Sequence, residues 1–355
     1  MEPIKGRGAT SNQASARFNI AQREEDPDWL DERARVDGAP RPPRSSVVAL
    51  HPKSILSFNS SPDIPFDRSI NAYQGCEHGC IYCFARPTHA FHDLSPGLDF
   101  ETSLFAKPDA PELLRKALAH PRYSPAPIAM GTNTDPYQPI EATWTITRRC
   151  IEVLAETGHP LTITTKSDRV LRDLDLLSPM AARGLVSVAL SITSLDPLTA
   201  RTVEPRAPAP RRRIAAIRAL ADAGVPTSVA VAPVIPAITD HEMEHILELA
   251  AEAGARNAFF IPVRLPHEVA PLFREWLDAH YPDRAQKVMN LIRSIRHGRD
   301  NDPGFFTRMR GFGPWAELMR TRFSIACRKL GLNSERETLR TDLFRPPQGA
   351  QLSLF

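Results

Sequence analysis

Cysteine and long apolar segments are both scarce in this chain of 355 residues. It has five cysteines, and no apolar run approaches the ~20 residues that span a bilayer, so we expect no membrane partner. The net charge is only +3, which by itself predicts no charged partner. With 42% apolar and 24% charged residues, the composition is that of an ordinary globular protein.

Three of the five cysteines, Cys76, Cys80 and Cys83, lie within eight positions, in the order C-E-H-G-C-I-Y-C. Thiols this close together are metal ligands or disulfide partners. No signal peptide is apparent, and Cys150 and Cys327 look unpaired, which argues against an oxidising compartment. We therefore expect a cytoplasmic location and a metal site.

The chemistry of the cysteine loop favours an iron–sulfur cluster. Structural zinc usually takes four protein ligands, often from two cysteine pairs, and no second pair follows. A zinc site completed by His78 or His89 remains as the weaker alternative. A [4Fe–4S] cube takes one thiolate per iron, so three thiolates leave one iron open to a small molecule. Such a site suits chemistry more than structure.

Beyond the cysteine loop, short apolar runs alternate with amphipathic stretches, as in repeated strand–helix units. Near-continuous apolar runs such as 227–234 are typical of a parallel sheet buried on both faces. Right-handed crossovers would wrap six units into an open barrel. The prediction is an α/β fold, a partial (β/α)6 TIM-type barrel. The predicted strands are Ser69–Tyr73, Pro127–Gly131, Leu161–Thr165, Val186–Thr193, Thr227–Val234 and Ala258–Val263.

Helices are expected between these strands and after them. A capping box from Thr239 to Glu242 and a C′ glycine, Gly254, would bracket one of them. The expected helices are 109–120, 145–157, 168–182, 210–223, 240–253, 272–279, 284–297 and 314–330. Residues 284–329 carry eleven Lys/Arg and three acidic residues, a local charge of +8 that either meets phosphates or forms solvated helix faces.

These patterns predict four segments. The predicted division is a polar N-terminal arm (1–65), the barrel (66–270), a basic C-terminal helical extension (271–345) and a tail (346–355).

The cysteine loop after the first predicted strand, with Tyr82 before the third cysteine, resembles the radical S-adenosylmethionine (SAM) superfamily. Three further sequences resemble a bacterial branch related to spore photoproduct lyase. They are S-P-D-I-P-F-D-R-S-I-N at 61–71, G-T-N-T-D-P-Y-Q-P-I-E at 131–141 and V-A-P-V-I-P at 231–236. The resemblance implies that a [4Fe–4S] cluster on Cys76, Cys80 and Cys83 cleaves SAM to a 5′-deoxyadenosyl radical.

The resemblance also implies where SAM is bound. The loop after the second strand would take the methionine amino group, Lys166 the carboxylate, and Ser191 with Thr193 the ribose. Each residue alone is equally compatible with a structural role, but together they mark the strands' carboxyl ends, where barrels bind ligands. The predicted cofactor-binding residues are Tyr82, Gly131, Thr134, Asp135, Lys166, Ser191, Thr193 and Arg206.

The chain departs from spore photoproduct lyase in the residues that return a hydrogen atom to the product radical. Spore photoproduct lyase uses a cysteine after its second strand and a tyrosine just past the third cluster cysteine. Alignment places Thr132 and Phe84 at these positions. Neither side chain is a useful hydrogen-atom donor, so we expect radical generation without the lyase reaction.

The expected substrate is a nucleic-acid base, with a modified RNA or a peptide as alternatives that the sequence does not separate. The expected electron donor is a flavodoxin or ferredoxin. The alternative is a DNA-associated iron–sulfur protein whose cluster is structural or redox-sensing, without turnover.

The last five residues, Gln351, Leu352, Ser353, Leu354 and Phe355, resemble the pentapeptide by which bacterial repair proteins bind the sliding clamp. An exposed Leu-x-Leu-Phe needs a covering partner, or else packs back onto its own domain. Short peptides of this kind place alternate side chains in preformed pockets.

We predict that deleting 351–355 abolishes clamp binding, measured by surface plasmon resonance, and leaves SAM cleavage unchanged. Burial of three apolar side chains contributes about 5 kcal/mol before ordering costs, which suggests micromolar affinity. A synthetic C-terminal peptide should compete. Clamp binding by the truncated protein would contradict the assignment.

Overall fold

The computed structural model describes residues 3–18, 44–335 and 338–347. Its central sheet has seven strands in the order β10-β9-β8-β7-β6-β3-β2. Neighbouring strands run parallel from β10 to β3, and β2 lies antiparallel to β3. The strands are β2 (Leu56–Phe58), β3 (Arg68–Ile70), β6 (Ile128–Met130), β7 (Leu161–Thr165), β8 (Val186–Ser191), β9 (Thr227–Val234) and β10 (Asn257–Pro262).

The two edge strands, β2 and β10, do not pair with each other, so the sheet stays open. Six parallel strands in chain order confirm the predicted partial (β/α)6 barrel. The antiparallel strand β2 extends it at one edge.

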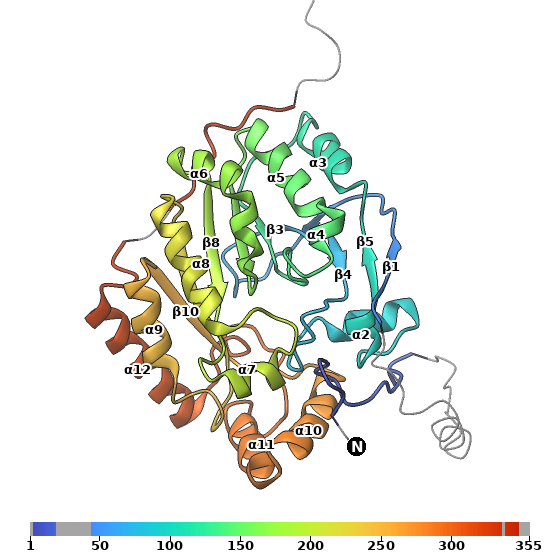
Figure 1. The fold of residues 1–355 in the computed structure, drawn as a ribbon, viewed down its shortest axis with the longest axis vertical. Coiled ribbons are helices and arrows are strands. Elements are labelled where there is room, and N and C mark those ends of the chain that lie inside the picture. Colours follow the sequence, from blue (N-terminus) through green and yellow to red (C-terminus); the bar gives the residue numbers. More distant parts are fainter. Residues whose placement is uncertain (1–2, 19–43, 336–337, 348–355) are drawn as a thin grey trace, which may run out of the picture.

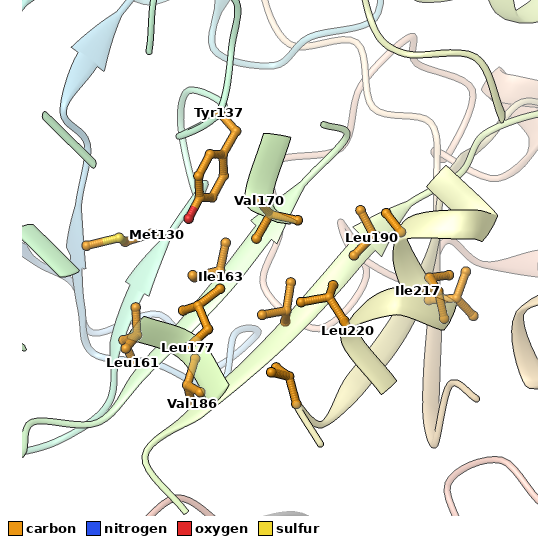
Figure 2. Packing of buried hydrophobic residues seen from close by; sticks show 14 of the residues in the cluster. Met130, Tyr137, Leu161, Ile163, Val170, Leu177, Val186, Leu190, Ile217 and Leu220 are labelled. Atoms are coloured by element: carbon orange, nitrogen blue, oxygen red, sulfur yellow. The ribbon is translucent and has the colours of Figure 1, made fainter. Parts of the chain in front are cut away.

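Helices form an arc outside the sheet (Figure 1). In chain order they are α3 (Ala110–Leu118), α4 (Glu141–Trp144), α5 (Ile146–Glu156), η2 (Asp168–Asp173), α6 (Leu174–Ala182), α7 (Pro197–Val203), α8 (Pro210–Asp222) and α9 (Met243–Glu252). Between sheet and helices lies the apolar core, which includes Ile163, Leu177 and Leu220 (Figure 2). Burial of both sheet faces explains why the strands read as nearly continuous apolar runs.

The chain after β10 is helical: α10 (Val269–His280), η3 (Pro282–Arg284), α11 (Ala285–Ser294) and α12 (Gly313–Leu330). Helix α12 packs on α9 and β10, with Arg322 paired to Glu244 at 2.5 Å. Phe323 of α12 lies against Phe260 of β10, their ring centres 4.9 Å apart. No helix in the described part of the chain is long and apolar enough to cross a membrane.

A second, three-stranded sheet corrects the prediction for Ser69–Tyr73. Strand β3 ends at Ile70, and Tyr73–Gln74 forms β4 in the sheet β1-β5-β4, with β1 at Ser46–Ala49 and β5 at Ser103–Ala106. The chain turns between them because the Oδ1 atom of Asn71 accepts hydrogen bonds from the amides of Asn133 and Thr134. These hydrogen bonds fix Asn71 to the loop that follows β6.

The predicted capping box at Thr239–Glu242 is wrong. Helix α9 begins at Met243, and the hydroxyl of Thr239 instead accepts the amide of Ile235. Glu242 accepts the amide of Leu195. Gly254 does end the helix with φ of +96°, where a side chain would be strained, as predicted. Thr239 thus caps a turn just before the helix, and only Glu242 is engaged by a residue far along the chain.

Residues 3–18 lie against the cysteine loop and α10. The amides of Gly8 and Ala9 both donate to the carboxylate of Glu101, which belongs to α2 (Asp99–Thr102). Further along, the amide of Leu98 donates to the carbonyl of Ser11. We call residues 3–18 the N-terminal strap. At the opposite end of the barrel, residues 338–347 pack beside the starts of β7 and β8, where the amide of Arg340 donates to the carbonyl of Gly184.

Gly8 allows the strap its close approach to the cysteine loop. A Cβ atom there would lie 1.8 Å from the carbonyl oxygen of Gly79, which is backbone and cannot move away cheaply. We predict that Gly8→Ala displaces the strap and increases hydrogen exchange of amides in 76–83 and 98–101, measured by mass spectrometry. Lys5→Ala, at an exposed position of the same N-terminal strap, is the control. Unchanged exchange in the Gly8 variant would contradict this packing.

Candidate functional site

The three cysteines lie together in the loop between β4 and η1 (Arg86–His92), at the carboxyl end of the parallel sheet. Cys76 and Cys80 are buried, and Cys83 is partly exposed. Among the described residues, no three His, Cys, Asp or Glu side chains are arranged to hold one metal ion.

Arg86 sets the shape of the cysteine loop. Its guanidinium is fully buried and donates to the carbonyls of Cys80 and Gly79. The same group donates to the carbonyls of Pro96 and Gly97. Its Nη2 atom also forms an ion pair with Glu101 at 2.5 Å. Every guanidinium nitrogen thus has a partner, and the loop is wrapped around one cation.

Burial also determines the pKa values of the three thiols. It raises the pKa of Cys80 to about 12 and raises the pKa values of Cys76 and Cys83 as well, because thiolates are poorly solvated there. Without a metal the three groups would be protonated at neutral pH. Binding an iron–sulfur cluster would therefore release protons, since the ligands are thiolates.

A second group of polar residues lies at the ends of β7 and β8. The Nζ atom of Lys166 donates to the hydroxyl of Ser191 at 3.1 Å. Thr193 donates to the Oε1 atom of Glu204 at 2.7 Å, and the hydroxyl of Tyr82 donates to the same oxygen. Tyr82 belongs to the cysteine loop, so this contact joins that loop to the strand ends.

Glu204 is the centre of this group. Its Oε1 atom lies 3.9 Å from Nζ of Lys166, and its Oε2 atom lies 2.5 Å from Arg213 of α8. Burial opposes the charged carboxylate, but Arg213, Lys166 and the two hydroxyls outweigh it and lower the pKa of Glu204 to about 2. Burial likewise opposes the Lys166 ammonium, yet the charges of Glu204 and Cys80 raise its pKa overall.

The loop after β6 contributes a third set. Gly131 has φ of +87°, and a Cβ there would lie 1.9 Å from the carbonyl oxygen of Thr164, so only glycine fits. Thr134 donates to the carbonyl of Tyr73. Asp135 accepts the hydroxyl of Thr165 at 2.6 Å and the amide of Lys166 at 2.8 Å.

Asp135 also faces the cysteine loop, because its Oδ2 atom lies 3.4 Å from Nδ1 of His78. Burial opposes the Asp135 carboxylate, but His78, Thr165 and the Lys166 amide lower its pKa below the ordinary value. Thr134 and Asp135 thus both have protein partners. They shape the loop around the cysteines.

Arg206 lies apart from the other predicted residues, at the rim. It pairs with Glu77 of the cysteine loop at 3.1 Å and borders a hollow of about 650 Å³. His78 lines the same hollow. Arg206 therefore contacts the outside of the cysteine loop.

The structure brings seven of the eight predicted cofactor-binding residues together at one end of the barrel. The cofactor-binding residues predicted from the sequence do not include Arg86, Glu101, Glu204 or Arg213. No local pattern marks these residues, because each is recognised by a charged partner elsewhere in the chain. Cys150 and Cys327 are buried in the apolar core, where burial raises the pKa of each thiol.

The comparisons with known proteins agree with this arrangement. The model of the radical SAM superfamily matches residues 70–250. An uncharacterised protein of Mycobacterium tuberculosis (strain ATCC 25618 / H37Rv) is 38% identical over 71% of this chain and 76% of its own. The chain belongs to the radical SAM superfamily, whose members bind a [4Fe–4S] cluster and SAM.

Two further similar proteins are named for a function. The structure of spore photoproduct lyase complexed with dinucleoside spore photoproduct is similar in fold, with a TM-score of 0.56, 18% identity, and coverage of 81% of this chain and 80% of the lyase. The radical SAM Nalpha-GlyT isomerase of Pseudomonas phage M6 is 26% identical over 63% of this chain and 45% of its own. As a member of the radical SAM superfamily, the chain is an enzyme with SAM and an iron–sulfur cluster as cofactors.

The donor set fits these cofactors. Three buried or partly buried thiols in one loop would provide cluster ligands, and a lysine, hydroxyls and a tyrosine lie at the neighbouring strand ends. The thiols come from the loop that Arg86 holds in shape.

Glu204 provides a test of the strand-end group. We predict that Glu204→Gln destabilises the protein by about 3–5 kcal/mol at pH 7, because Arg213 and Lys166 lose their buried counter-charge. The folded pKa of about 2 lies below the ordinary 4.5, so the carboxylate stabilises fully above pH 4.5 and not below pH 2.

Unfolding by urea between pH 5 and pH 3 measures this effect. Wild-type stability should fall more steeply across this interval than that of the Glu204→Gln variant. Glu248→Gln, at an exposed position of α9, is the control and should follow the wild type. If the stabilities of Glu204→Gln and the wild type fell in parallel with pH, the Glu204 carboxylate would not be the group that stabilises the strand ends.

Proposed function

We propose that this enzyme cleaves SAM reductively and uses the resulting radical to abstract a hydrogen atom from a nucleic-acid base. The observation that carries the proposal is the contact between the cysteine loop and the strand-end residues through Tyr82 and Glu204. The bound cluster would supply the electron that breaks the sulfonium C–S bond of SAM, which yields methionine and a 5′-deoxyadenosyl radical.

The residues of this chain would then have distinct tasks. Cys76, Cys80 and Cys83 would hold three irons and leave the fourth for the amino and carboxylate groups of methionine. The pKa of Lys166 is raised, so its ammonium group remains charged at neutral pH. A charged ammonium suits a carboxylate partner.

Ser191 and Thr193 would hold the ribose, and Tyr82 would lie beside the adenine. In the described structure these side chains bond to one another and to Glu204, so SAM would replace some of these contacts. Gly131, Thr134 and Asp135 would shape the loop around the methionine group, and Arg206 would support the cysteine loop from outside through Glu77.

One structural neighbour supports a nucleic-acid substrate, because the structurally similar lyase is complexed with a dinucleoside photoproduct. The excess of Lys and Arg in 284–329 is compatible with phosphate binding. The alternative, a DNA-associated protein with a structural or redox-sensing cluster, does not account for the polar residues gathered at the strand ends.

The hydrogen return would differ from that of spore photoproduct lyase. Thr132 replaces the lyase's cysteine, and its hydroxyl faces the side-chain amide of Asn71. Phe84 replaces the tyrosine and is 49% exposed. Neither group donates a hydrogen atom readily. The product radical would therefore be quenched by another donor or rearrange.

We propose two protein partners. A flavodoxin or ferredoxin would supply the electron for each cleavage. The sliding clamp would bind residues 351–355, which lie outside the described residues. The preceding segment, 338–347, packs at the end of the barrel opposite the cysteine loop, so clamp binding would leave the site accessible.

Anaerobic reconstitution tests the proposed chemistry. We expect about four iron and four sulfide per chain, and dithionite-dependent formation of 5′-deoxyadenosine and methionine from SAM. Alanine at Cys76, Cys80 or Cys83 should abolish both, whereas Cys150→Ala should not. Stoichiometric zinc in place of iron would overturn the proposal.

The strand-end assignment needs a binding measurement. Lys166→Ala should weaken SAM binding to the reconstituted enzyme at least tenfold by equilibrium dialysis, because the methionine carboxylate loses its cation. Lys116→Ala, at an exposed position of α3, is the control. If Lys166→Ala binds SAM like the wild type, the binding-protein alternative gains.

A further inference from the structure

The segment between α11 and α12 connects the two open edges of the barrel. Arg296 is fully buried, and its Nη2 atom donates to the carbonyls of Pro262 and Val263 at the end of β10. Its Nη1 atom donates to the carbonyls of Thr307 and Arg308. One buried cation thus fastens this segment to the edge strand β10.

The same segment also reaches the opposite edge. Arg308 pairs with Asp63 at 2.5 Å and donates to the hydroxyl of Ser61, both in the loop after β2. The amide of Phe306 donates to Asp63 as well. We call residues 296–312 the bridging segment, because it spans the gap between two strands that do not pair.

The bridging segment exposes aromatic rings. Phe305 is 54% exposed, Phe306 69% and Phe312 45%. Three large apolar rings in eight residues on a surface are costly unless a partner covers them. Phe84, which directly follows the cluster ligand Cys83, is also exposed.

Arg264 links Phe84 to this segment. Its guanidinium lies 5.9 Å from the centre of the Phe84 ring, and Nη1 lies 3.2 Å from Sδ of Met309. Its Nε atom is buried and has no hydrogen-bond partner. Burial and the nearby Arg308 charge lower the pKa of Arg264. The guanidinium of Arg264 has a buried N–H without an acceptor and lies near a second cation. Both features favour an anion as its ligand.

Further cations lie on the bridging segment. Arg299 and Arg310 are exposed, and neither pairs with an acidic side chain in the described part of the chain. The acids nearby are already engaged: Asp300 pairs with Arg293, and Asp302 accepts the hydroxyl of Thr307. The surface thus offers rings and unneutralised arginines together.

We propose that the bridging segment, with Phe84 and Arg264, binds single-stranded nucleic acid and leads one base to the cysteine loop. Bases would stack on Phe305 and Phe306, and phosphates would contact Arg264 and Arg310. This inference rests on the proposed nucleic-acid substrate and assigns the surface that receives it.

The chemistry of the surface distinguishes this ligand from others. Every unpaired base has an aromatic face, whereas the bases of a duplex are stacked on one another and unavailable. An apolar peptide would use the rings and leave the arginines without partners, and an acidic peptide would use the arginines and leave the rings exposed. A single strand uses both.

Fluorescence anisotropy with the reconstituted full-length enzyme and SAM tests this inference. The probes are a labelled 12-nucleotide single strand of mixed sequence, as DNA and as RNA, and the corresponding DNA duplex. We expect a single strand to bind more tightly than the duplex. Phe305→Ala combined with Phe306→Ala should weaken its binding at least tenfold, since stacking on each ring is lost. The matched control is Phe259→Ala, an exposed ring on β10.

The contribution of the arginines is measured separately, from the salt dependence of binding. Arg310→Gln should reduce the slope of log K against log salt by about 0.7, the value for one phosphate contact on a single strand. Lys329→Gln, at an exposed position of α12, is the control and should keep the wild-type slope. Iron content and thermal midpoint, measured for each variant, show whether it is folded.

The outcomes separate the two proposals. If the enzyme cleaves SAM but binds neither strand nor duplex, the nucleic-acid substrate and this surface both fail. If a single strand binds equally well to the wild type and the double phenylalanine variant, the surface is wrong while the substrate class stands. Preference for the duplex would also overturn the stacking mode.

Discussion

The buried ion pair between Arg86 and Glu101 is the interaction on which the site depends. Arg86 holds four carbonyls of the cysteine loop and its surroundings, and Glu101 holds the amides of Gly8 and Ala9. Two charges withdrawn from water are tolerated only when their remaining donors and acceptors are satisfied, and here they are. The pair therefore connects the cysteine loop, α2 and the N-terminal strap as one unit.

Glu204 has the corresponding role at the strand ends. It connects Arg213 of α8, Lys166 after β7, Thr193 after β8 and Tyr82 of the cysteine loop. Because the carboxylate is buried among cations, its charge is maintained at neutral pH. The position of the cysteine loop relative to the strand ends thus depends on electrostatics as well as on apolar packing. A site for a charged cofactor such as SAM can use the same cations.

The open sheet creates a second requirement. A parallel barrel of six strands leaves two unpaired edges, and unpaired edges expose backbone groups. Strand β2 pairs with β3 on one side, α12 packs on β10 on the other, and the bridging segment spans the gap with Arg296 and Arg308. The chain after β10 is therefore part of the barrel's architecture, and its exposed rings lie where a large substrate would reach the opening.

Features that depend on neighbouring residues could be predicted from the sequence, namely six strands from apolar periodicity and the helix end at Gly254. The cluster ligands, expected from the spacing of Cys76, Cys80 and Cys83, stay a prediction. The prediction failed for Thr239, which accepts the nearby amide of Ile235, and for Glu242, which accepts the distant amide of Leu195. It also failed for the separate strand at Tyr73. Only the tertiary structure decided that Arg86 meets Glu101 and that Tyr82 meets Glu204 across 122 positions. Arginine and glutamate are common on any surface, and which of them becomes a buried partner is set by the packing of segments far apart in the chain.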